Sequence, residues 1–191
     1  MWLTNRRAAR YLGPLAGVFL GLPAGAADTG AGPAAAPEAQ PAVWAQKQLK
    51  FLFQGFTTHY SCDGLEDKIK HVIRELGARA DFQVHSFGCV TPYGRPDPFP
   101  SVSITMSVLE PAPAGASAAD VVAAHWQRTD LHLDRDPVWE AGDCELLEQI
   151  KQKLLPLFAT RNVDFASNCV PHQLELGTRL SADLLVPDKR G

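Results

Sequence analysis

The segment CDGLEDKIKHVIRELGARADFQVHSFGC, residues 62–89, combines a helix pattern and a strand pattern between two cysteines. The apolar residues of its first half all fall on one face of a helix: Leu65, Ile69, Val72, Ile73 and Leu76. A capping box of Asp63 and Glu66 is expected to start this helix, and Gly77 to stop it. Residues 81–88 then alternate polar and apolar side chains, which is typical of a strand. The segment therefore predicts a helix that begins at the first cysteine and a strand that ends at the second.

Two further strands are expected to flank this segment. Alternating apolar residues predict a strand over residues 47–58. A proline-rich loop at residues 91–100 separates the segment from a strand that alternates cleanly. The apolar positions of that strand are Val102, Ile104, Met106 and Val108, and its polar positions are Ser101, Ser103, Thr105 and Ser107. Residues 43–110 thus have the predicted order strand–helix–strand–strand.

The second half of the folded region, residues 119–187, repeats this plan without close sequence similarity. Residues 119–124 are expected to be a short helical turn or irregular. The strand that follows leads into a helix whose cap is assigned to Asp143, and Pro156 is expected to end or kink that helix about one turn early. After a returning strand, the last strand is predicted to extend over residues 174–186.

These patterns predict an α+β fold. Two tandem β-α-β-β units are expected to form a two-layer sandwich related to ferredoxin-like folds, an internal repeat of pattern rather than of sequence. Both helices are expected on one face of a mainly antiparallel sheet, with polar side chains on the other face. The alternative is two separate subdomains of about 60 residues, each small enough to need a disulfide.

The first 26 residues have the pattern of a cleavable signal peptide for export to the periplasm. Three arginines precede an apolar stretch that is too short to cross a bilayer, and PAGA at residues 23–26 supplies a small-residue cleavage site. The alternative is an uncleaved anchor, which two prolines near the stretch disfavour. Residues 27–42 form a predicted Ala/Pro-rich flexible tether, and residues 43–187 are predicted to be a single domain.

Four cysteines in an exported chain predict two disulfides. They are Cys62, Cys89, Cys144 and Cys169. The sequence has no C-x-x-C pair, which disfavours a zinc site or a thioredoxin-like redox centre. Three pairings are possible. In a strand–helix–strand crossover the start of the helix lies near the end of the returning strand, which favours Cys62–Cys89 and Cys144–Cys169.

Composition limits the classes of function. Hydrophobic residues make up 46% and charged residues 20% of the 191 residues, which excludes a wholly disordered chain, a collagen-like fibre and a multi-span membrane protein. Loss of the three signal-peptide arginines takes the net charge from −3 to −6, which argues against nucleic acid as a partner. No membrane span is expected in the mature chain. Motifs for nucleophile elbows, phosphate loops, dinucleotide sites and HExxH zinc sites are missing, so we assign no catalytic residue and expect no cofactor.

A polar sheet face is the main candidate binding surface. Its expected members are Ser101, Ser103, Thr105, Ser107, Gln83 and Arg179. An open polar face suits an envelope protein or a glycan as partner, although any half-solvated sheet has the same pattern.

A weaker candidate is a copper or zinc site. His59, His85 and His172 each lie within four residues of a cysteine, so the disulfide end of the sheet is where they could meet. The alternative is that these imidazoles are scattered at strand ends. The hydroxyl-rich segment at residues 57–61 similarly suggests a small-anion site at a helix start, or else a simple helix cap by Ser61 or Asp63.

Two segments, FTTHYSCDGL at residues 56–65 and TRNVDFASNCVPH at residues 160–172, resemble segments of proteobacterial exported proteins of unknown function. The resemblance extends over residues 44–186 and implies an envelope protein of a Gram-negative bacterium. It implies no reaction. Two functions stay open: a non-catalytic envelope protein that binds a protein or glycan, and a small periplasmic enzyme or metal carrier that uses the three histidines.

Overall fold

The structure is a computed structural model that describes residues 39–188. The predicted signal peptide and residues 27–38 of the predicted tether lie outside the described residues. Strand β1 begins at Gln40, so the last three residues of the predicted tether are part of the sheet. Among the described residues, no helix is long and apolar enough to cross a bilayer.

The chain is α+β, with six strands and two helices in the described region. The strands are β1 (Gln40–Leu52), β2 (Gln83–Phe87), β3 (Ser101–Pro111), β4 (Val121–His132), β5 (Thr160–Ala166) and β6 (Arg179–Pro187). The helices are α1 (Cys62–Glu75) and α2 (Cys144–Gln149), and α2 continues as the π-helical turn η1 (Ile150–Leu154) and the 3₁₀ turn η2 (Leu155–Leu157).

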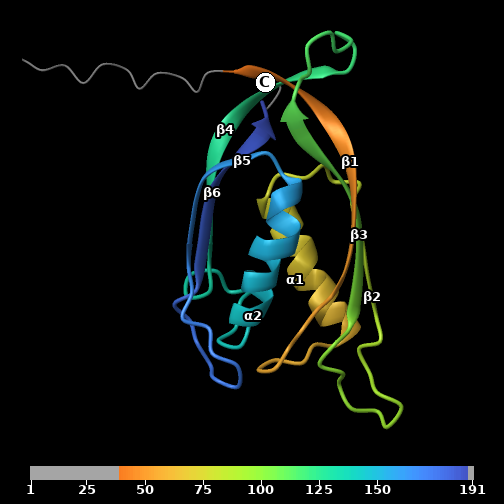
Figure 1. Cartoon of the computed structure of the whole chain (residues 1–191), viewed down its shortest axis with the longest axis vertical. Helices are drawn as coiled ribbons and strands as arrows, with labels where there is room; N and C mark the ends of the chain where they lie inside the picture. The colour runs from red at the N-terminus through yellow and green to blue at the C-terminus, as the bar shows by residue number, and fades with distance from the viewer. Residues whose placement is uncertain (1–38, 189–191) are drawn as a thin grey trace, which may run out of the picture. The chain divides into compact units, whose positions relative to one another are not determined.

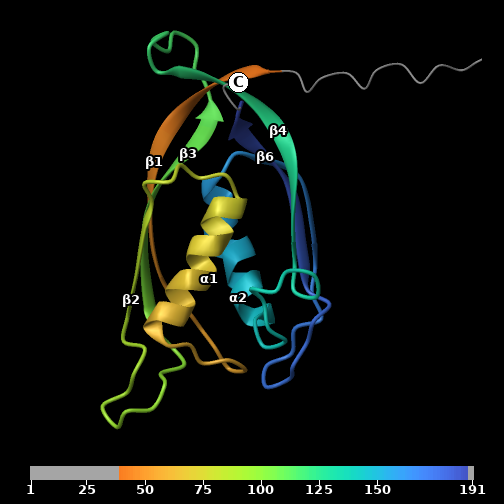
Figure 2. The same cartoon turned by 180° about the vertical axis from the view of Figure 1, so that it is seen from behind.

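The six strands form one open, fully antiparallel sheet in the order β2-β3-β1-β4-β6-β5. Strand β1 pairs with β3 from Ala42 to Leu52, but it pairs with β4 only from Gln40 to Val43. Beyond this short ladder the two strands diverge, which divides the sheet into the groups β2-β3-β1 and β4-β6-β5 (Figure 1). Both helices lie between the two groups, as the opposite view also shows (Figure 2).

A single cluster of buried side chains joins the helices to both groups of strands. Its members include Leu65, Ile69, Val72 and Ile73 of α1, Leu146, Leu147 and Ile150 of the second helix, Val102, Ile104 and Met106 of β3, and Leu180 and Leu184 of β6. These are the apolar positions that alternate or recur at helical spacing in the sequence, so burial follows the predicted periodicity. The two halves therefore share one core.

Both disulfides join the start of a helix to the segment after the returning strand. Cys62 is bonded to Cys89 with their Cα atoms 5.4 Å apart, and Cys144 is bonded to Cys169 at 5.5 Å. This is the pairing that the crossover geometry favours. No cysteine in the described region is free.

The predicted capping box of Asp63 and Glu66 and the predicted side-chain cap by Asp143 do not form, whereas the alternative cap by Ser61 does. Ser61, rather than Asp63, caps α1: its hydroxyl accepts a hydrogen bond from the Gly64 N–H at 3.1 Å. Glu66 accepts instead from the Ser86 N–H at 2.7 Å, so it covers the edge strand β2. Asp143 occupies the cap position of α2, but its side chain makes no capping hydrogen bond.

Pro156 changes the second helix as expected. Regular α-helix ends at Gln149, and the chain passes through η1 and η2. Pro156 lies in η2, where it has no N–H to donate to the carbonyl one turn back, so α-helical hydrogen bonding does not resume there. These turns keep Ile150, Leu154 and Leu155 buried. The apolar stripe therefore still faces the core.

Two predicted boundaries in the second half are wrong. Strand β4 already begins at Val121, because pairing with β1 and β6 outweighs the weak local pattern of residues 119–124. Strand β6 begins only at Arg179, and Leu174 is 76% exposed in the loop before it. The Glu175 carboxylate accepts hydrogen bonds from N–H and hydroxyl groups two and three residues later, which turns the chain there.

Candidate functional site

The part of the sheet formed by β2, β3 and β1 has one face toward the helices and one face away from them. We call the second side the outer face (Figure 1). Its members are Gln83, His85 and Phe87 of β2, Ser101, Ser103, Thr105 and Ser107 of β3, and Gln46, Gln48, Lys50 and Leu52 of β1. The intervening residues of β3 are buried in the core, so alternation along the strand defines the face.

The register of the three strands arranges these side chains in rows across the outer face. Ser103 of β3 lies between His85 and Lys50. Thr105 similarly lies between Gln83 and Gln48. The hydroxyls from Ser101 to Thr105 are therefore flanked on both sides by longer side chains, and Ser107 is flanked by Gln46 on the β1 side.

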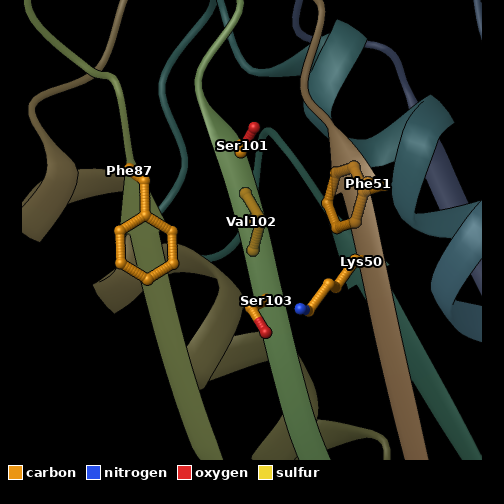
Figure 3. A pocket seen from close by; sticks show the side chains of 6 residues that line it. All are labelled: Lys50, Phe51, Phe87, Ser101, Val102 and Ser103. Atoms are coloured by element: carbon orange, nitrogen blue, oxygen red, sulfur yellow. The ribbon is translucent and has the colours of Figure 1, made fainter.

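A hollow of about 560 Å³ lies over one end of the outer face. It is lined by Lys50, Phe51, Phe87, Ser101, Val102 and Ser103 (Figure 3). The Lys50 side chain extends toward Ser103 from one side of β3, and the ring of Phe87 stands on the other side. Phe87 is 59% exposed, whereas phenylalanine is among the residues most often buried.

A second hollow of about 280 Å³ continues along the same strand. Its lining includes Thr105 and Ser107 of β3, Trp44 of β1, and the Arg79–Asp81 pair that follows α1. The Arg79 guanidinium lies over the Trp44 ring at 5.6 Å and donates a hydrogen bond to the Ser107 hydroxyl at 3.1 Å. Its hydrogen bond to Asp81 lowers the pKa of that carboxyl.

The outer face carries positive rather than negative free charge. Asp81 is the one carboxylate among the residues that line the two hollows, and Arg79 already pairs with it. Lys50 forms no ion pair with any described residue. In a chain with a net negative charge, this face is therefore able to receive an anion.

The structure gathers most of the predicted binding residues and separates one of them. Gln83 and the four hydroxyl residues of β3 share the outer face. Arg179 lies on β6, in the other group of strands and on the far side of the helices (Figure 1). Its group carries a network in which Asp183 pairs with Arg128 at 3.4 Å and with Arg161 at 3.3 Å, so that surface is occupied by its own charges.

The predicted histidine site does not form in the described part of the chain. No three His, Cys, Asp or Glu side chains among residues 39–188 are placed to hold a metal ion. His85 belongs to the outer face, and the ring of His172 packs against Phe56 with the centroids 6.2 Å apart. His59 joins neither in a metal-binding group.

The hydroxyl-rich segment before α1 is already bound by a carboxylate of the protein. Glu145 of α2 accepts hydrogen bonds from the N–H groups of Phe56 at 2.8 Å and Thr57 at 3.0 Å, and from the Thr57 hydroxyl at 3.1 Å. Ser61 is the cap of α1. The contacts with Glu145 therefore join the two halves of the fold, and Ser61 caps the helix start where an anion site was suggested.

Sequence reasoning missed a buried polar network at the same end of the molecule. Asp143 is fully buried and accepts hydrogen bonds from the Tyr60 hydroxyl, from Lys68 Nζ at 2.6 Å and from the Glu140 N–H at 2.8 Å. Lys68 also donates to the Val138 carbonyl at 2.7 Å. Tyr60 and Asp143 are 83 residues apart, and no spacing in the sequence indicates their contact.

This network predicts a loss of stability in alkaline solution. Burial raises the pKa of the Tyr60 phenol above its ordinary value of 10.0, and the charge and hydrogen bond of Asp143 raise it further. The folded state keeps this proton where the unfolded chain loses it, so the stabilisation is full below pH 10 and decreases above it by about 1.4 kcal/mol per pH unit. Urea unfolding of wild type and Tyr60→Phe between about pH 9 and about pH 11 measures this slope. Equal slopes for the two proteins would contradict the assignment.

Comparisons of the chain with protein-family models, with curated proteins and with solved structures found no match. The functional interpretation therefore depends on the geometry and chemistry of the residues themselves.

Proposed function

We propose that this is a non-catalytic protein of the Gram-negative cell envelope, exported to the periplasm by a cleavable signal peptide. Two disulfides in a chain with no free cysteine in its described region support an oxidising compartment. The arginines and apolar stretch of the first 26 residues support export.

We propose that the outer face is its binding surface. The observation that carries this proposal is the hollow of about 560 Å³ where an exposed phenylalanine, two hydroxyls and an unpaired lysine surround one space. Ligand sites combine aromatic surface with a few polar groups that fix orientation, and this hollow has both. Its lining comes from three neighbouring paired strands, so the side chains are held by a rigid scaffold.

A tandem arrangement of two β-α-β-β units is also part of the proposal. The orders β1-α1-β2-β3 and β4-α2-β5-β6 support it, together with the equivalent positions of the two disulfides. On this interpretation the outer face and the charged surface around Asp183 occupy equivalent places in the two units. The first unit would then bind the ligand, while the second is stabilised by its own ion pairs.

Filling the hollow tests the binding surface. We expect Ser103→Trp to reduce retention of the purified mature protein on an isolated Gram-negative envelope fraction by at least about tenfold, because the indole occupies the ligand's space. The matched control is Arg179→Trp, on the exposed surface of the other group of strands, and it should be retained like wild type. Circular dichroism and thermal unfolding check that both variants are folded.

Equal retention of Ser103→Trp and wild type would overturn the outer face as the binding surface. Failure of the wild-type protein to be retained would overturn the proposed envelope-binding function itself.

A further inference from the structure

The two hollows of the outer face follow one another along β3, and we call the two together the groove. The first hollow includes Ser101 and Ser103, and the second includes Thr105 and Ser107. At about 3.3 Å per residue, this row of hydroxyls is about 20 Å long. Phe87 stands at one end and Trp44 at the other. The groove therefore suits a linear ligand of several units rather than a compact small molecule.

We propose that the ligand of this groove is a linear glycan that carries carboxylates, of the uronic-acid type. This inference rests on the proposed function and names the ligand class of the same face. Three observations support the inference: the hydrogen-bonding chemistry of the hydroxyl row on β3, the positive charge beside that row, and the position of β3 as the central strand of the group β2-β3-β1.

The side chains along the row match the hydroxyls of a sugar. Serine and threonine hydroxyls and glutamine amides both donate and accept hydrogen bonds, as sugar hydroxyls do. Gln83 and Gln48 flank Thr105, Gln46 flanks Ser107, and Lys50 flanks Ser103, so three of the four hydroxyls have an amide or charged neighbour across the sheet. The rings of Phe87 and Trp44 offer apolar surface to the C–H faces of sugar rings at the two ends.

The charge of the groove favours a carboxylate on the glycan. Lys50 has no ion pair with a described residue, and its side chain extends toward Ser103 (Figure 3). An ammonium group has only donors, so it pairs best with an anionic acceptor. Arg79 supplies further N–H donors beside Ser107 in the second hollow.

The same face is poorly suited to a protein or peptide partner. Serine and lysine are depleted in protein interfaces, whose centres are apolar, and this face has three serines in its row with Lys50 beside them. A peptide that adds as a strand needs an open sheet edge. From Ser101 to Thr105, strand β3 is paired on both sides, with β2 and with β1, so no backbone edge is open beneath these residues. At Ser107 the carbonyl already accepts a hydrogen bond from the Arg79 N–H at 2.9 Å.

Calorimetric titration with tetragalacturonate, a linear uronic-acid tetrasaccharide, tests the proposal. We expect one site per chain, with affinity at least about tenfold higher than for the neutral maltotetraose and decreasing between about 0.05 M and about 0.5 M salt. Lys50→Gln should lower the affinity about tenfold. Arg179→Gln removes the same charge from the other group of strands and should change the affinity by less than about twofold. Phe87→Ala should weaken binding without unfolding the protein, because its ring is 59% exposed.

Three results would overturn the glycan proposal: equal or tighter binding of maltotetraose, equal loss of affinity in the two charge variants, or tighter binding of an acidic hexapeptide at the same site. If tetragalacturonate does not bind while Ser103→Trp still abolishes retention on the envelope fraction, the ligand class is wrong and the proposed function stands. If both experiments fail, the proposed function fails with it.

Discussion

Replacing Cys144 and Cys169 with alanine is expected to lower the free energy of unfolding by about 3 kcal/mol. The disulfide joins residues with a sequence separation of 25, and its loss lets the unfolded chain explore many conformations that the cross-link forbids. Alanine keeps the site apolar, which matters because Cys144, the first residue of α2, is fully buried in the hydrophobic core. Urea unfolding of the two proteins without reductant measures the difference.

The second disulfide provides the matched comparison. Removing Cys62 and Cys89 opens a separation of 27 residues, so a similar loss is expected. Removing both bridges should cost about 6 kcal/mol, a large share of the 5–15 kcal/mol that stabilises a typical domain. A loss below about 1 kcal/mol in either variant, or free thiols in protein purified without reductant, would contradict the role assigned to the bridges.

Asp143→Ala is expected to destabilise the fold by about 3–5 kcal/mol. Asp143 is fully buried and its ion-pair partner Lys68 has only 12% of its side chain exposed, so removing the carboxylate leaves an ammonium group without its anionic partner in a region with little water. The Tyr60 hydroxyl loses its acceptor as well. The free energy of unfolding near neutral pH measures the combined loss.

An exposed ion pair serves as the control. Glu110→Ala breaks the 2.6 Å ion pair between Glu110 and Lys47, whose side chains are 41% and 28% exposed, respectively. It should lower the free energy of unfolding by less than about 1 kcal/mol. The double variant Lys68→Met with Asp143→Ala should recover part of the loss, because it removes both buried charges together. Similar losses for Asp143→Ala and Glu110→Ala would show that the buried pair contributes no more than a surface one.

The elements with strong local patterns could be predicted from the sequence. The apolar stripe of α1 and the alternation of β3 specify both the secondary structure and the buried face. The disulfide pairing also followed, because a strand–helix–strand crossover brings its two ends together whatever the rest of the chain does. The hydroxyl row of β3 was likewise placed correctly on the side away from the core.

Contacts between distant segments could not be predicted in this way. Thr57 meets Glu145 and Tyr60 meets Asp143 across more than 80 residues, and these partners decide which groups are free for function. Next to the predicted anion site, the Phe56 N–H donates a hydrogen bond to Glu145. Asp143, the predicted cap of α2, accepts a hydrogen bond from Lys68 instead.

By itself, the sequence determined the strands and helices with clear periodicity and their buried faces, since each depends on neighbours along the chain. It favoured one of three disulfide pairings, and the structure confirmed that pairing. Only the tertiary structure decided that β1 and β4 diverge after four paired residues. That divergence puts Arg179 on a different surface from Ser103. Periodicity says which face of a strand meets the core, but the position of one strand group relative to another depends on how the helices fill the space between them.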